Sequence, residues 1–145
     1  MNIEKFFSKS DKARIVEAIR DAEKQTSGEI RVHLESTCKT DTLERAVKVF
    51  EKLKMHETQL HNGTLIYLAV KDKKFAIFGD KGINETVPEN FWQDVRDCMR
   101  GEFNQGKFAE GLIAGIGMVG QKLKEIFPYQ DDDINELTDD LSIGK

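Results

Sequence analysis

Residues 115–120 read Gly-Ile-Gly-Met-Val-Gly, the glycine spacing that cradles the pyrophosphate of a dinucleotide. That chemistry requires a strand before the glycines and a helix that opens at them. No strand pattern precedes this motif, and the apolar residues through it keep helical spacing: Phe108, Leu112, Ile116, Val119 and Leu123. We therefore interpret the glycines as small residues of one helix that approaches its neighbours closely, and we expect no dinucleotide cofactor.

Two further pairs of residues come close to catalytic patterns. His56 and His61 lie five residues apart, so two imidazoles on a helix would point away from each other rather than share a zinc ion. Cys38 and Arg45 are one residue too far apart for the phosphate loop of cysteine phosphatases. We expect exposed loop histidines and an ordinary loop cysteine, because a thiolate nucleophile would have to be cradled within that loop.

Carboxylates are the remaining candidates for chemistry, and many lie near the end of the chain: Asp131, Asp132, Asp133, Glu136, Asp139 and Asp140. Calcium takes about six to eight oxygen ligands, which clustered carboxylates can supply. A standard EF-hand is excluded, because Glu136 stands where the turn glycine belongs and Ser142 where the bidentate glutamate belongs. The alternative is a solvated acidic tail, although four apolar residues could dock it on the domain: Ile134, Leu137, Leu141 and Ile143.

The elements that hold these residues follow from hydrophobic periodicity. Helices are predicted over 10–25, 40–55, 88–101 and 107–126, and strands over 29–35, 64–70 and 74–79. The first strand alternates apolar and polar residues, so His33 is expected to be exposed on its polar side. This order predicts an α/β fold, a three-layer α/β/α sandwich on a small mixed central sheet, Rossmann-like in character. The pattern does not locate a fourth strand.

The predicted topology brings acidic residues to both ends of the sheet. Glu29, Asn62-Gly63 and Asp80 should share one edge, where the glycine-flanked loop 79–85 could turn backbone carbonyls toward an ion. The opposite edge, at the carboxyl ends of the parallel strands, should hold three acidic residues: Glu35, Asp41 and Asp72. The sequence does not decide which of the two edges would hold a metal ion. The candidate metal ligands are Glu29 and Asp80, together with Asp131, Asp132, Asp133 and Glu136 of the tail.

Composition excludes several classes of protein. The 145 residues suffice for one domain, and 39% hydrophobic with 33% charged residues describe a soluble globular protein. A net charge of -4 and the lack of a basic stripe argue against nucleic-acid binding. No apolar run approaches the ~18 residues of a membrane span, and the first residues lack the apolar core of a signal peptide. Two cysteines without metal-type spacing predict reduced thiols in the cytoplasm.

Three segments resemble the TPM domain family over roughly residues 8–125: AIRDAEKQTSGEIRV, TLIYLAVKDKKFAIFGDKGI and FNQGKFAEGLIAGI. The most specific parts are AE-x-x-TSGEI and the hairpin that ends in G-x-x-GI, with Glu23, Glu29 and Gly82 matching the family pattern directly. The resemblance implies an α/β/α sandwich. It also implies diverse roles, since plant members are linked to acid phosphatase activity and photosystem II repair, an animal member to receptor modulation, and some members bind calcium at acidic loops.

This chain departs from the plan of many family members, which carry a signal peptide and a membrane segment. It looks like a stand-alone, non-membrane bacterial TPM domain over 1–127, followed by an acidic tail over 128–145 that docks on it. No catalytic residue is carried over from the family. The first hypothesis is a module that binds Ca²⁺ or Mg²⁺ and has a regulatory or partner-binding role. The alternatives are a metal-assisted acid phosphatase and a metal-free protein-interaction module.

Overall fold

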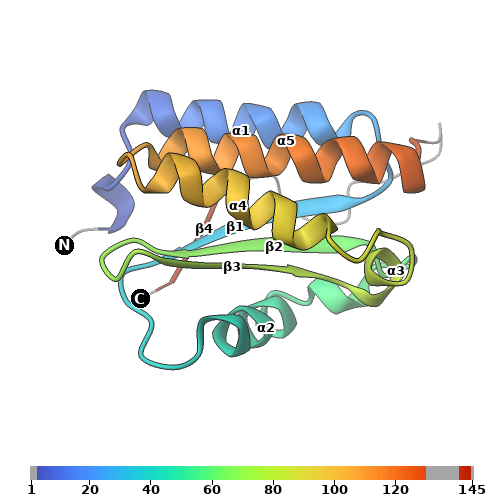
Figure 1. Ribbon diagram of the computed structural model, residues 1–145, viewed down its shortest axis with the longest axis horizontal. Coiled ribbons are helices and arrows are strands. Elements are labelled where there is room, and N and C mark those ends of the chain that lie inside the picture. The colour runs from blue at the N-terminus through green and yellow to red at the C-terminus, as the bar shows by residue number, and fades with distance from the viewer. Residues whose placement is uncertain (1–2, 130–140, 145) are drawn as a thin grey trace.

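The computed structural model describes residues 3–129 and 141–144, which form a sheet between two helical layers (Figure 1). The strands are β1 (Glu29–Glu35), β2 (Gly63–Ala69), β3 (Lys74–Gly79) and β4 (Ser142–Ile143). The helices are α1 (Lys9–Glu23), α2 (Thr42–Lys52), α3 (Lys81–Asn84), α4 (Phe91–Phe103) and α5 (Phe108–Ile126), with 3-10 turns η1 (Ile3–Lys5) and η2 (Met55–Glu57). The predicted three-layer α/β/α sandwich is confirmed.

The strand order in the sheet is β3-β2-β1-β4. β1 and β2 are parallel and joined through α2, whereas β2 and β3 form an antiparallel hairpin, as the sequence predicts. β4, which the sequence did not locate, lies parallel to β1 at the edge of the sheet (Figure 1). It pairs through only two residues, Ser142 with His33 and Ile143 with Leu34. Such a short strand has no hydrophobic period that sequence analysis can detect.

Alternation along the strands divides the core between the two faces of the sheet. Ile30, Val32 and Leu34 of β1 face α1, α4 and α5 and belong to the larger apolar cluster. The other face packs Leu65 and Tyr67 of β2 against α2 in a smaller cluster. In Figure 1, α1, α4 and α5 cover one face while α2 covers the other. The odd-numbered residues of β1, including His33 and Glu35, therefore lie on the face of α2.

The Gly-x-Gly-x-x-Gly motif lies inside α5, so its interpretation as part of a packing helix is confirmed. A Cβ atom added at Gly115 would lie 2.5 Å from the Met99 sulfur of α4, and one at Gly120 would lie 2.7 Å from the Ala22 Cβ of α1. The glycines thus allow α5 to approach both neighbouring helices. Within residues 3–129 and 141–144, no helix is long and apolar enough to cross a membrane.

Several predicted boundaries differ from the observed ones. α1 begins at Lys9, one residue before the predicted start, because Ser8 is its N-cap and the Ser8 hydroxyl accepts a 3.0 Å bond from the Asp11 amide. α2 ends at Lys52, before Lys54 adopts a left-handed backbone with φ of 60°. The segment 79–85, expected as an open loop, contains the one-turn helix α3, which Asp80 caps.

Candidate functional site

The amino edge of the sheet joins the start of β1, the start of β2 and the end of β3, as predicted. The Glu29 amide donates to the Asn62 carbonyl at 3.2 Å, and the Asp80 amide donates to the Gly63 carbonyl at 2.9 Å. Glu29 therefore begins β1 and Asp80 follows β3, with β2 between the two strands, and the Glu29 side chain is buried while Asp80 is half-buried.

Asp80 already has two roles at this edge. One carboxylate oxygen accepts a 2.8 Å bond from the Lys81 amide as the N-cap of α3, and the other lies 3.4 Å from Nδ1 of His61. The carbonyls of Leu60 and His61 face Gly82, where a Cβ atom would collide with them. These two carbonyls are therefore packed against α3.

The acidic tail begins at the same edge. Pro128 forms a bridge with Thr26, just before β1, and the Tyr129 amide donates to the Gln25 carbonyl at 3.2 Å. The predicted ligands of the tail lie outside the described residues: Asp131, Asp132, Asp133 and Glu136. In residues 3–129 and 141–144, no group of three or more histidine, cysteine, aspartate or glutamate side chains converges to hold a metal ion.

The carboxyl edge holds a compact polar cluster, here called the Glu35 cluster: His33, Glu35, Arg45, Tyr67 and Ser142. Glu35 is its centre and only 3% exposed. Its Oε1 accepts bonds from Arg45 Nε at 2.9 Å and from the Tyr67 hydroxyl at 2.5 Å. Its Oε2 accepts from Arg45 Nη2 and lies 3.2 Å from His33 Nε2. Both carboxylate oxygens are thus fully engaged.

The far side of the His33 ring binds β4. His33 Nδ1 lies 2.7 Å from the Ser142 hydroxyl. Since Nε2 faces an acceptor-only carboxylate, it carries the proton, and Nδ1 accepts from the hydroxyl. Burial lowers the pKa of His33, which favours this neutral ring. The prediction that His33 is exposed is wrong, because the ring lies between Tyr67 of β2 and Ser142 of β4 on the two neighbouring strands.

Electrostatics keep Glu35 ionised. Burial alone would raise its pKa, but hydrogen bonds from Arg45, Tyr67 and His33 outweigh burial and lower the pKa to about 2. Burial and the neighbouring carboxylate raise the pKa of Tyr67, so the phenol stays protonated as a donor. The cluster therefore contains a fixed anion surrounded by donors. It has no group poised to take or give a proton near neutral pH.

This ionisation predicts a pH dependence of stability. Because the folded-state pKa of Glu35 is lowered from 4.5 to about 2, its contribution is complete above 4.5 and lost as the pH falls toward 2. The free-energy difference between the wild type and Glu35→Gln should then shrink by up to ~1.4 kcal/mol per pH unit in that window. Urea unfolding of both proteins at a series of pH values measures this difference. A difference that stays constant with pH would contradict the assigned ionisation.

The other predicted residues of the carboxyl edge have structural roles. Asp41 is the N-cap of α2, and its carboxylate accepts from the Glu44 amide at 3.1 Å. Asp72 accepts from the Cys38 amide at 2.9 Å. Cys38 itself is buried, its sulfur lies 3.4 Å from the Thr40 carbonyl, and Arg45 is turned to Glu35 rather than toward an anion. Because of these contacts, Cys38 and Arg45 do not form the phosphate-binding arrangement of a cysteine phosphatase.

Tyr67 and Ser142 belong to the Glu35 cluster, although neither is among the site residues predicted from the sequence. Tyr67 lies opposite His33 in the register of β1 and β2, and the two rings stack at 6.0 Å between centroids. A signal existed for Tyr67, since it is a polar-tipped residue in an otherwise apolar central strand and should find a partner when buried. No comparable signal existed for Ser142.

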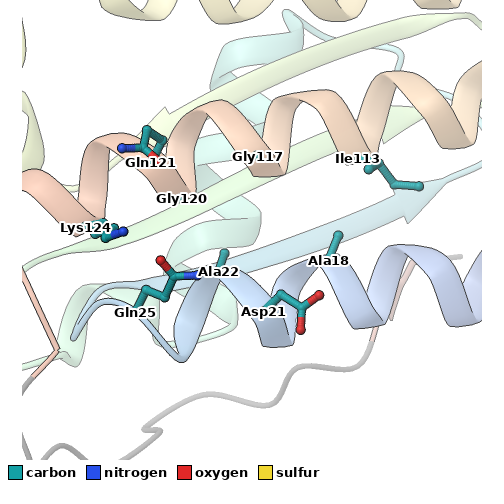
Figure 2. A pocket seen from close by; sticks show the side chains of 9 residues that line it. All are labelled: Ala18, Asp21, Ala22, Gln25, Ile113, Gly117, Gly120, Gln121 and Lys124. Atoms are coloured by element: carbon teal, nitrogen blue, oxygen red, sulfur yellow. The ribbon is translucent and has the colours of Figure 1, made fainter.

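A shallow groove between α1 and α5 is the other concave feature of interest, with a volume of about 270 Å³ (Figure 2). Small residues line its floor: Ala18, Ala22, Gly117 and Gly120. Its polar residues are exposed rather than buried within it: Asp21, Gln25, Gln121 and Lys124. Because no buried polar group converges there, the groove does not define the chemistry of a ligand.

Comparisons with known proteins agree with this architecture. The model of the TPM domain matches residues 2–122. The NMR structure of the BA42 protein from the psychrophilic bacterium Bizionia argentinensis has 51% sequence identity and a TM-score of 0.92, covering 99% of both chains. No curated protein sequence matches the chain.

Two more distant solution structures share the fold. The N-terminal domain of the cg2496 protein from Corynebacterium glutamicum has 18% identity and a TM-score of 0.66, covering 81% of this chain and 74% of that one. The N-terminal domain of a protein from P. gingivalis has 21% identity and a TM-score of 0.68, covering 82% and 77%.

Proposed function

Because the chain belongs to the TPM domain family, we propose that it is a divalent-cation-binding module with a regulatory or partner-binding role. The cation is Ca²⁺ or Mg²⁺, and the module acts on a protein partner. Its two free cysteines favour a location in the cytoplasm. One observation carries the proposal. The described residues on either side of the acidic positions 131–140 are held near the two ends of β1: Pro128 bridges Thr26 just before the strand, and Ser142 pairs with His33 near its end.

The two anchors support the proposal because they fix the positions at which the acidic stretch of the sequence leaves and rejoins the domain. Pro128 and Tyr129 contact the chain just before β1, and Ser142 pairs with His33 near the end of β1. The intervening residues can span about 40 Å when extended, whereas β1 is only about 20 Å long. This slack allows the chain to bring several carboxylates to one ion, while the anchors limit the entropy lost in doing so.

Asp80 and Glu29 lie at the edge from which the acidic segment starts. Asp80 is the more accessible of the two, and its carboxylate has further acceptor positions besides those used by Lys81 and His61. An ion held by the acidic segment could therefore take an oxygen from Asp80. Neutralising clustered carboxylates also removes their mutual repulsion, so the cation should stabilise the folded state.

The test is a titration of chelator-treated protein with Ca²⁺ and then Mg²⁺, followed by amide shifts in two-dimensional NMR. We expect saturable shifts confined to Glu29, Asp80 and Gly82, or to the acidic segment 131–136, together with a rise in the thermal midpoint. Potassium chloride at matched ionic strength is the control for screening. Weak, unsaturated shifts spread over all acidic residues would contradict the proposal.

A matched pair of variants locates the site. Asp80→Asn preserves the N-cap of α3, because asparagine caps helices as well as aspartate does, but it removes the charge. Asp41→Asn makes the same change at the N-cap of α2 on the opposite edge. If Asp80 contributes a ligand, Asp80→Asn should weaken Ca²⁺ binding on the order of tenfold while Asp41→Asn leaves it unchanged. Equal effects of both variants would exclude Asp80 as a ligand.

A further inference from the structure

Residues 141–144, here called the latch, are held on β1 by few contacts. The two residues of β4 pair with β1, and the Gly144 amide donates to the Leu34 carbonyl at 2.7 Å. Leu141 packs against the larger apolar cluster, whereas Ile143 is 40% exposed. The latch therefore buries little apolar surface, and a change in one polar contact can shift its docking.

The latch covers both nitrogens of the His33 ring. The Ser142 hydroxyl lies 2.7 Å from Nδ1. A Cβ atom added at Gly144 would lie 2.8 Å from Nε2, so the backbone of the latch also comes close to this second nitrogen. Docking thereby helps to withdraw the ring from water, and His33 is only 6% exposed. Because undocking returns the ring to solvent, protonation of His33 and docking of the latch are linked.

A proton and the latch compete for the same atom of this ring. Nε2 carries a hydrogen toward Glu35, so Nδ1 has the only free lone pair of the neutral ring. That lone pair accepts the hydrogen of Ser142, and the described residues offer this hydroxyl no other partner. A proton on Nδ1 turns the acceptor into a donor. The hydroxyl must then turn its oxygen toward the ring, and its own buried hydrogen loses its acceptor.

The charges around His33 do not cancel the cost of protonation. Glu35 favours a charged ring, but its two oxygens already accept from Arg45 and Tyr67. Burial opposes the charged ring most strongly, and the positive charges of Arg45 and Arg31 add to this opposition. β2 contributes the neutral phenol of Tyr67, and the described residues of the latch bring no charged side chain. The pKa of His33 in the docked protein is therefore lowered from 6.5.

We propose that the latch is a pH-sensitive device, closed on a neutral His33 and released when this ring takes up a proton. In the undocked state the ring is solvated and titrates near the ordinary pKa of about 6.5. The docked ring accepts a proton only at a lower pH. Docking is therefore strongest above pH 6.5 and weakens as the pH falls below that value, by up to about tenfold per pH unit, until the docked ring is also protonated.

The device is separate from the other ionisation in the Glu35 cluster and from the proposed cation site. Glu35 has a pKa of about 2, so it stays ionised throughout the range in which His33 titrates. Every contact used here is made by residues 31–67 and 141–144. A failure of cation binding would therefore leave the latch untouched, and a failure of the latch would leave cation binding untouched.

Hydrogen exchange of the Gly144 amide measures docking, because this amide is bonded to β1 only while the latch is closed. Its protection factor is the exchange rate expected for an open chain at the same pH divided by the observed rate. We expect this factor to be constant above about pH 6.5 and to fall by up to about tenfold per pH unit as the pH is lowered to about 5.5.

His33→Asn separates the proton from the contact. The asparagine oxygen can still accept from the Ser142 hydroxyl, but the amide is not protonated in this pH range. We expect the Gly144 protection factor of this variant to be independent of pH. His56→Asn, which removes an exposed histidine of η2, is the matched control and should keep the wild-type pH dependence.

A second measurement leaves His33 in place. Gly144→Val should open the latch at every pH, because a Cβ atom there would lie 2.5 Å from Glu35 Oε2 and 2.8 Å from His33 Nε2. Since linkage is reciprocal, opening the latch should raise the pKa of His33 from its wild-type value toward about 6.5. The shifts of the ring nitrogens in NMR spectra, followed against pH, give this pKa in both proteins.

Three results would overturn the proposal. The first is a wild-type protection factor of Gly144 that does not change between about pH 7.5 and pH 5.5. The second is a fall in this factor that persists in His33→Asn, because another group would then cause it. The third is a pKa of His33 that is the same in the wild type and in Gly144→Val, because docking and protonation would then not be linked.

Discussion

Replacing Glu35 with glutamine is expected to destabilise the protein by about 1–3 kcal/mol, the cost of leaving buried hydrogen-bonding groups without partners, because the Arg45 side chain is 35% exposed and stays partly solvated. Glutamine fills the same volume, so the loss isolates charge and hydrogen bonding. The wild-type carboxylate accepts from Arg45, Tyr67 and His33 on its two oxygens. The glutamine side chain has only one carbonyl oxygen, and its NH₂ group lies against donors that the second carboxylate oxygen had accepted from. Those buried donors are then left without an acceptor.

Urea unfolding followed by far-ultraviolet circular dichroism measures this loss. The comparison requires that the slope of the unfolding free energy against urea concentration is the same in both proteins. Glu51→Gln on the exposed side of α2 is the matched control and should change stability by less than about 0.5 kcal/mol. Glu35→Gln should also weaken docking of β4, seen as a shift of the Gly144 amide. Equal stability of the two variants would mean that the Glu35 cluster contributes no net stabilisation.

The fold could be predicted from local patterns because its main elements are strongly periodic. The apolar face of α1 and the alternation of Ile30, Val32 and Leu34 each identify an element and the side that it buries. The continuous apolar run of β2 is typical of a strand inside a sheet, and β2 lies between β3 and β1. β4 lacked any such signal, because two residues do not establish a period and its pairing partner lies more than a hundred positions away.

The error at His33 follows from the missing strand. Alternation correctly assigned His33 and Glu35 to the same face of β1, and only the assignment of that face to solvent was wrong. Topology likewise brought Glu29 and Asp80 to one edge, but it did not show that Asp80 caps α3. The sequence pattern therefore predicted correctly which of these residues lie near one another. Hydrogen bonds decide whether a side chain has a structural or a ligand-binding role. They depend on interatomic distances, which the spacing of residues along the sequence does not specify.

The glycines of α5 lead to the second prediction, in which the same substitution has opposite signs three residues apart. Gly117 is exposed and a Cβ atom there would meet nothing within 4 Å, so Gly117→Ala should stabilise the protein by about 0.5–1 kcal/mol through helix propensity. Gly120→Ala gains the same propensity but places its methyl group 2.7 Å from the Ala22 Cβ. Overpacking of this kind costs about 1–3 kcal/mol.

The collision at Gly120 cannot be relieved by a rotamer change, since the Ala22 Cβ is fixed to the backbone of α1. Either α1 or α5 must move, and both pack on the larger apolar cluster through residues such as Ile19 and Ile116. Because the gain in helix propensity is common to both variants, their unfolding free energies should differ by the overpacking cost, roughly 1–3 kcal/mol, in thermal and urea unfolding. A phosphate-cradling turn would require both glycines, and losing either would then be harmful. Opposite signs are expected only if the motif is a helix packed against α1 on one side and open at Gly117 on the other.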